Sequence, residues 1–91
     1  MSEHRRKEIT CMLQFLKMAL KYCEPYKDIV SMSYEEVGND QLVIVSYEHE
    51  VKDYVTEDSY TIVSSFTVNV NCDSNSAMIN DVMAAVNNYF N

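Results

Sequence analysis

The segment SYTIVSSFTVNVN, residues 59–71, constrains the fold of this 91-residue chain more than any other feature. Apolar and small polar side chains alternate along most of it, and successive side chains of a β-strand point to opposite faces of a sheet. The apolar positions are Tyr60, Ile62, Phe66, Val68 and Val70. The pattern therefore predicts a strand with one buried and one solvated face, as is typical of antiparallel sheets.

Two further strands are predicted upstream, at 28–37 (DIVSMSYEEV) and 41–50 (QLVIVSYEHE). In the first, Val30, Met32 and Tyr34 alternate with polar residues, and the second carries a β-branched run with Val43, Val45 and Tyr47 on one face. The letters VGNDQ between them form a turn signal of Gly, Asn and Asp. Residues 49–58 leave two alternatives open. If TEDS at 56–59 is a tight turn, EHEVKDYV continues the second strand into a long hairpin; otherwise 49–58 is a loop.

A helix is predicted at each end of the chain. Residues 3–24 carry apolar side chains at spacings of three and four, the period of one buried helical stripe, and the Glu-Pro pair that follows disfavours helical geometry. Residues 74–90 repeat this period after a run of Asp, Ser and Asn, whose side chains can accept hydrogen bonds from a first helical turn. That run is not a calcium loop, because Ala77, Met78 and Ala84 stand where an EF-hand needs an oxygen ligand, a glycine and a glutamate.

The first helix also carries a second apolar stripe, made of Cys11, Phe15, Met18 and Tyr22. A surface helix needs an apolar stripe only somewhat wider than about 100°, and the two stripes together cover roughly twice that width. The excess indicates a helix that packs on two sides. Its second side is either buried within the fold or an exposed patch for association, with Phe15, Met18 and Tyr22 as the candidate patch, because interfaces favour aromatic residues and Met.

Together these elements predict a single α+β domain over 1–91, built of two layers. The order is helix-strand-strand-strand-helix, with a three-stranded antiparallel sheet and both helices on one face, because the other face is solvated. The residues expected to be nearly buried are Leu13, Leu16, Leu20, Val45, Phe66, Val68, Ile79, Val82 and Val86.

The net charge of -7 is distributed unevenly along the chain. Residues 1–27 hold six of the seven basic residues and have a net charge of +3, whereas residues 28–91 have only Lys52 against eleven acids, a net charge of -10. Such a field argues against direct binding of nucleic acid, which draws its affinity from many phosphate contacts. It favours a basic protein as the partner.

Eight carboxylates in the middle of the chain form the candidate partner-binding face. They serve either as a solvated surface that keeps the protein soluble or as a surface that docks on a basic partner. Catalysis by a carboxylate pair needs a pocket with unequal environments, and one glycine and no long insertion leave little to build a pocket. The eight residues are Glu35, Glu36, Asp40, Glu48, Glu50, Asp53, Glu57 and Asp58.

The cysteines and histidines are the remaining reactive side chains. Cys11, Cys23 and Cys72 are an odd number without a CxxC pair, which indicates reduced, buried thiols rather than disulfides or a zinc site. A thiol nucleophile needs a nearby base or positive charge, and only Cys72 precedes a helix N-terminus. His49 is expected to be exposed to solvent. The sequence therefore predicts no catalytic residue, no metal site and no cofactor.

Two known classes share this element order. Double-stranded RNA-binding domains depend on basic residues at the start of their last helix, where this chain has CDSNSAMIND, so that function is rejected. In size, acidity and element order the chain resembles small phage anti-CRISPR proteins, which inhibit a Cas nuclease by placing an acidic surface on the site for the PAM duplex. The resemblance rests on this profile rather than on a residue motif. It implies that the eight carboxylates stand in for phosphates, as in a DNA mimic.

We therefore expect a non-enzymatic, small acidic binding protein that inhibits or adapts a larger basic partner of the nucleic-acid-binding kind. The alternative is a homodimeric structural or assembly protein that associates through the first helix, by two-fold helix-to-helix contact. The apolar runs are too short for a membrane span, and the N-terminus MSEHRRKEIT has no apolar signal core. We expect a cytoplasmic protein, in the host cytoplasm if a phage encodes it.

Overall fold

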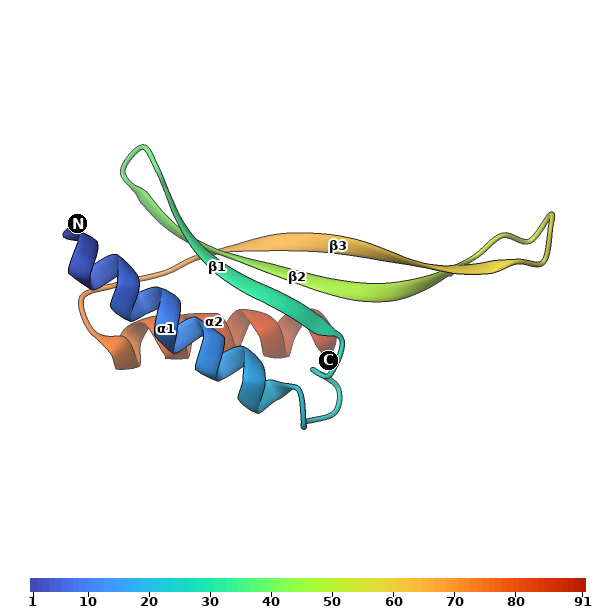
Figure 1. The fold of residues 1–91 in the computed structure, drawn as a ribbon, viewed down its shortest axis with the longest axis horizontal. Coiled ribbons are helices and arrows are strands. Elements are labelled where there is room, and N and C mark those ends of the chain that lie inside the picture. Colours follow the sequence, from blue (N-terminus) through green and yellow to red (C-terminus); the bar gives the residue numbers. More distant parts are fainter.

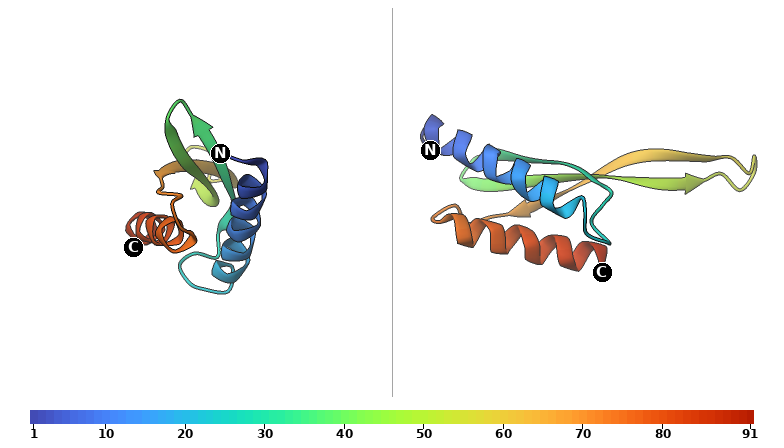
Figure 2. Two further views of the ribbon diagram at one scale, coloured as in Figure 1. Left: turned by 90° about the vertical axis from the view of Figure 1, so that its left-hand side faces the viewer. Right: turned by 60° about the horizontal axis from the view of Figure 1, so that its bottom comes forward.

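The computed structural model describes residues 1–91 and has the expected α+β fold (Figure 1). Its elements are α1 (Glu3–Leu20), β1 (Ile29–Val37), β2 (Asp40–Lys52), β3 (Ser59–Asn69) and α2 (Asn75–Phe90). The strands form one antiparallel sheet in the order β1-β2-β3. Both helices lie on one side of it, α1 against β1 and α2 against β3 (Figure 2). Neither helix combines the length and the apolar composition that crossing a membrane requires.

The central strand β2 has the alternation expected of it. Val43 and Val45 point toward the helices and are fully buried. In the register of the sheet, Val43 lies opposite Val68 of β3 and Val45 lies opposite Phe66. Since successive side chains point to opposite faces, the positions between these residues form the solvated face, away from both helices.

The first strand departs from simple alternation. Its register with β2 shifts between Ile29, which lies opposite Tyr47, and Ser31, so that Val30 is an extra residue. Such a β-bulge changes which face the following side chains point to. As a result Ile29 and Met32, three positions apart, are both buried in the core.

Thirteen buried apolar residues form one core between the sheet and the helices. Six of the nine residues predicted to be buried belong to it: Leu13, Leu20, Val45, Val68, Val82 and Val86. The prediction of near-complete burial was wrong for Leu16, Phe66 and Ile79, which are only partly buried. A chain of this length buries a smaller share of its surface than a larger domain does, so more of its core residues lie at the rim.

Both helices begin at a serine cap. Ser2 and Ser74 each accept a hydrogen bond from the backbone N–H three residues later, both at 3.1 Å, so the polar run before α2 is a helix start, as predicted. The helix predicted for residues 3–24 ends earlier, at Leu20, because residues 21–28 form successive turns. The proline in that segment marks only the latest point at which the helix can end.

Strands β2 and β3 continue together past the end of β1, whose pairing reaches only Tyr47. Residues 48–63, which we call the arm, form a two-stranded ribbon that stays paired as far as Lys52. The arm projects beyond both helices (Figures 1 and 2), and the molecule measures 50 Å along its long axis against 29 and 21 Å across. The alternative left open for residues 49–58 is thereby decided: the hairpin is long, and only 53–58 form its tip.

Candidate binding surfaces

The arm ends in a tightly bonded turn. The Asp53 carboxylate accepts hydrogen bonds from the backbone N–H groups of Val55, at 2.9 Å, and Thr56, at 3.4 Å. The Asp53 N–H donates to the carbonyl of Asp58 at 2.8 Å, and the Glu57 N–H donates to the carbonyl of Asp53 at 2.7 Å. Because the Val55 and Thr56 amides stabilise the charged carboxylate, they lower the pKa of Asp53. The tip thus holds a fixed shape with its acidic side chains at the far end of the molecule.

The arm has two chemically different faces. Val51, Tyr60 and Ile62 lie on the face that, in the body of the protein, packs on the helices. No helix reaches them here, so Tyr60 is 52% exposed and Ile62 is 37% exposed. Glu48 and Glu50 lie on the opposite, solvated face and are both exposed. One face of the arm is therefore mainly apolar, with His49 between Val51 and the body, and the other carries the acidic side chains together with Lys52 and Val63.

The eight candidate acidic residues form a strip rather than one cluster. Glu35, Glu36 and Asp40 lie near the β1–β2 turn, Glu48 and Glu50 on the arm, and Asp53, Glu57 and Asp58 at its tip. Along β2, Glu48 is six residues from Leu42, the partner of Glu35, which corresponds to about 20 Å of strand. The acidic residues of the strip are most concentrated on the arm, which contains five Asp or Glu residues and one lysine.

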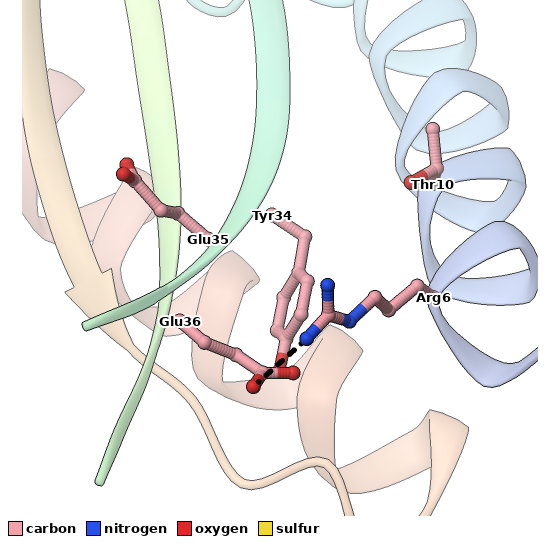
Figure 3. A pocket seen from close by; sticks show the side chains of 5 residues that line it. All are labelled: Arg6, Thr10, Tyr34, Glu35 and Glu36. Atoms are coloured by element: carbon pink, nitrogen blue, oxygen red, sulfur yellow. Dashed lines mark hydrogen bonds and ion pairs between the residues drawn. The ribbon is translucent and has the colours of Figure 1, made fainter. Parts of the chain in front are cut away.

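The neighbours Glu35 and Glu36 have opposite environments (Figure 3). Glu36 lies on the helix side, 3.3 Å from the Arg6 guanidinium, and accepts a hydrogen bond from the Tyr34 hydroxyl at 3.1 Å. Burial and this bond raise the pKa of Tyr34 to about 12, so the hydroxyl keeps its proton. With Thr10 these residues line a hollow of about 330 Å³ between α1 and β1. Glu36 thus ties the helix to the sheet, whereas Glu35 points away from Arg6.

Ion pairs are few in this molecule. They are Arg5–Glu8, Arg6–Glu36 and Lys27–Glu24. Of the eight candidate acidic residues, only Glu36 takes part in one. The other seven have no cationic side chain at ion-pair distance, and all of them except Asp53, whose carboxylate is bonded to the amides of the tip, are exposed to solvent.

A cluster of four aromatic side chains, which the sequence did not identify as a unit, fixes the base of the arm. The ring of Tyr89 stacks on that of Phe66, with 4.0 Å between ring centres. The ring of Tyr47 lies 5.3 Å from the rings of both Tyr89 and Phe90, and the Tyr47 and Tyr89 hydroxyls are hydrogen-bonded. All four residues lie on predicted apolar faces, but only the pairing of the strands and the placement of α2 bring them together.

The histidine and cysteine predictions were only partly right. His49 is half-buried and hydrogen-bonded to the Ser64 hydroxyl at 2.7 Å, rather than exposed. Cys11 and Cys23 are exposed rather than buried, because they lie on the outer side of α1 and on the turn after it. Cys72 is buried as predicted, and this burial raises the pKa of its thiol, which disfavours the thiolate. The fold gathers no group of three or more His, Cys, Asp or Glu side chains suited to a metal ion.

The second stripe of α1 lies open to solvent. Phe15 is 68% exposed, Met18 58% and Tyr22 88%, so this side of the helix is not buried within the fold, and of the two alternatives the exposed patch remains. At about 100° per residue Phe15 and Met18 lie roughly opposite Leu13, which faces the sheet, and Tyr22 follows them in the turn after α1. Cys11 extends the stripe toward the N-terminus, where a shallow hollow of about 410 Å³ adjoins it. We call Cys11, Phe15, Met18 and Tyr22 the outer stripe of α1.

Comparisons of the chain with protein-family models, with curated proteins and with solved structures found no match. No family is therefore assigned. The proposed function is therefore based on the charges and exposed surfaces of the molecule.

Proposed function

We propose that this protein is a non-enzymatic, acidic binding protein that inhibits or adapts a larger basic partner, one that itself binds nucleic acid. The observation that carries the proposal is the arm, where five carboxylates and a single lysine project from the body of the protein. None of the five takes part in an ion pair within the chain. Concentrated like charge destabilises a folded protein by self-repulsion, and a basic partner would relieve that repulsion.

The chemistry of such a contact follows from the carboxylates. A groove that binds phosphates is lined with Arg and Lys, and Arg forms paired hydrogen bonds with carboxylates as it does with phosphates. Glu48 and Glu50 on the ribbon, with Glu57 and Asp58 at the tip, would occupy the positions of phosphates and exclude the nucleic acid. Complementary potentials speed such an encounter, and the binding weakens as salt is added.

The most specific form of this proposal is DNA mimicry of the anti-CRISPR type. A Cas nuclease reads its PAM duplex with arginine side chains, and the carboxylates of a narrow acidic ribbon could pair with those arginines in place of the duplex. The purified protein, added to such a nuclease with its guide, should then abolish binding of the target DNA. If the nuclease still bound its target DNA, mimicry of the PAM duplex would be excluded. The broader proposal of a basic partner is tested separately by the capture experiment described next.

The capture experiment compares the wild-type protein with a variant whose arm is neutralised by Glu48→Gln, Glu50→Gln, Glu57→Gln and Asp58→Asn. Each protein is immobilised and incubated with nuclease-treated lysate of the native host at low and high salt. We expect the wild type to retain a basic nucleic-acid-binding protein at low salt, and the neutralised variant to bind it about tenfold or more weakly. In a separate assay, the wild-type protein should displace nucleic acid that has been bound to the purified partner.

The matched control removes the same number of charges outside the arm, through Glu3→Gln, Glu24→Gln, Asp28→Asn and Asp73→Asn. This control should capture the partner as the wild type does, because its arm is intact. Equal loss of binding in both variants would show that net charge alone attracts the partner. Capture by the arm-neutralised variant at the wild-type level, or by no protein at either salt concentration, would contradict the proposal.

A further inference from the structure

We infer that the apolar face of the arm packs on the outer stripe of α1 in a second copy of the chain, so that two copies form a closed two-fold dimer. This contact uses the face of the arm opposite Glu48 and Glu50. It leaves Glu48 and Glu50 free for the basic partner, and only the tip acids Glu57 and Asp58 take part in both contacts.

Both surfaces expose several apolar side chains that nothing else in the chain covers. A two-stranded ribbon alone is marginally stable in water, yet the arm exposes Tyr60 and Ile62 on a face that is core elsewhere in the sheet. The outer stripe of α1 exposes Phe15 and Tyr22 on the side turned away from the sheet. Contiguous exposed apolar residues of this kind mark interaction sites.

The two surfaces match in length. Strand β2 continues for five residues, 48–52, beyond the end of the three-stranded sheet, which corresponds to about 17 Å. From Cys11 to Leu20 the helix rises about 14 Å, and Tyr22 in the turn after α1 extends the outer stripe beyond that. One arm therefore covers one outer stripe along its whole length.

Their charges are complementary. The α1 segment, residues 3–21, holds five of the seven basic residues of the chain, and the arm holds five of its fourteen acids. Among the basic residues, Lys7 and Lys21 are exposed and take part in no ion pair. Opposite charges at the rim of an apolar contact steer association and fix its register.

The outline of the molecule allows both contacts to form at once. Both helices end where the arm leaves the body, so the space beside the apolar face of the arm holds no helix of the same chain (Figures 1 and 2). A two-fold rotation places the helices of the second copy in that space. The same rotation places the arm of the second copy across α1 of the first copy. Because the N-terminus of α1 lies at the end remote from the arm, the tip acids Glu57 and Asp58 then approach Lys7 of the other copy. The arrangement closes on itself, unlike a head-to-tail chain.

The buried area is of the size that a dimer needs. Taking about 200 Å² for an aromatic side chain, the exposed parts of Tyr60, Phe15 and Tyr22 amount to roughly 400 Å² in one contact and roughly 800 Å² in two. Val51, Ile62, Met18 and the charged rim add to this. The total then approaches the lower end of specific interfaces, about 1,200 Å².

The test uses two charge-reversed variants. The first reverses α1 through Lys7→Glu and Lys21→Glu, and the second reverses the arm tip through Glu57→Lys and Asp58→Lys. Light scattering at up to about 100 µM should show the wild type at twice the mass of one chain and each variant at the mass of one chain, because like charges then face each other in both contacts. Circular dichroism should show that both variants remain folded.

Mixing the two variants is the decisive step. In a mixed pair the acidic α1 of one chain faces the basic arm of the other, and the remaining contact has the wild-type charges, so the mass should double again. A third variant, Tyr60→Thr with Ile62→Thr, keeps every acidic side chain and should be a monomer that still captures the basic partner.

Several results would overturn the inference. A wild-type protein that stays a monomer would exclude the dimer. An arm-reversed variant that remains a dimer would show instead a helix-to-helix contact through α1. A mixture that stays monomeric would show that the arm and α1 do not meet, and one that grows beyond two chains would show an open chain instead of a closed pair.

Discussion

At the scale of single residues, the position on a strand decides what an acidic side chain does. Glu35 and Glu36 are adjacent and chemically equivalent in the sequence, and both belong to the predicted acidic face. In the sheet they point to opposite sides, so Glu36 contacts Arg6 and the Tyr34 hydroxyl while Glu35 has no cationic partner. After the bulge near Val30 the alternation of β1 is regular, so the sequence could place the two residues on opposite faces. It could not show that Arg6 of α1 lies within reach of Glu36, because that contact depends on how the helix packs on the sheet.

Asp53 provides a prediction at this scale. Its pKa is lowered by the amides of Val55 and Thr56, so its hydrogen bonds contribute to the turn at every pH above the ordinary aspartate range. They are lost only when the pH falls through the lowered pKa, below about 3.9. In an NMR titration, the amide signals of Val55 and Thr56 should move together with a midpoint below that value, and the movement should be absent in Asp53→Asn. A midpoint at or above it would show that these bonds do not form.

At the scale of elements, hydrophobic periodicity predicted both helices, all three strands and their order. It could not show which apolar faces are covered, since Tyr60 and Ile62 continue the alternation of β3 although no helix lies beneath them. The same limit applies to α1, where Phe15 and Tyr22 have helical spacing but face solvent. Periodicity identifies the face of an element on which apolar residues gather. Whether another element packs on that face depends on the lengths and positions of the other helices and strands.

Phe66 provides a prediction at the element scale. It packs under the base of the arm against Tyr47, Tyr89 and Phe90. Phe66→Ala should lower the free energy of unfolding by about 3 kcal/mol, the lower end of the range for buried Phe, because the ring is only partly buried. Denaturant unfolding followed by circular dichroism measures this loss.

The matched control for Phe66 is Val63→Ala, on the same strand but 60% exposed on the solvated face. It should change the free energy of unfolding by less than about 0.5 kcal/mol. If the two variants were equally stable, the aromatic cluster would not support the arm.

At the scale of the whole molecule, both the charge and the shape distinguish the region around α1 from the arm. The basic residues gather on and just after α1, and the acidic strip runs along the sheet to the tip of the arm. The arm therefore has an acidic face, which we propose binds the basic partner, and an apolar face, which we propose contacts a second copy. The body of the protein, with its thirteen buried residues, serves to hold this ribbon in a fixed direction.

Amide hydrogen exchange tests most directly whether the arm is the binding element. The exchange rates of a dilute sample of the protein are compared with those of its complex with the purified basic partner. We expect the amides of residues 48–63 to exchange about tenfold or more slowly in the complex, because partner contact suppresses the local opening of an uncovered ribbon. Protection confined to α1 and α2, with the arm exchanging as in the free protein, would contradict the proposed function.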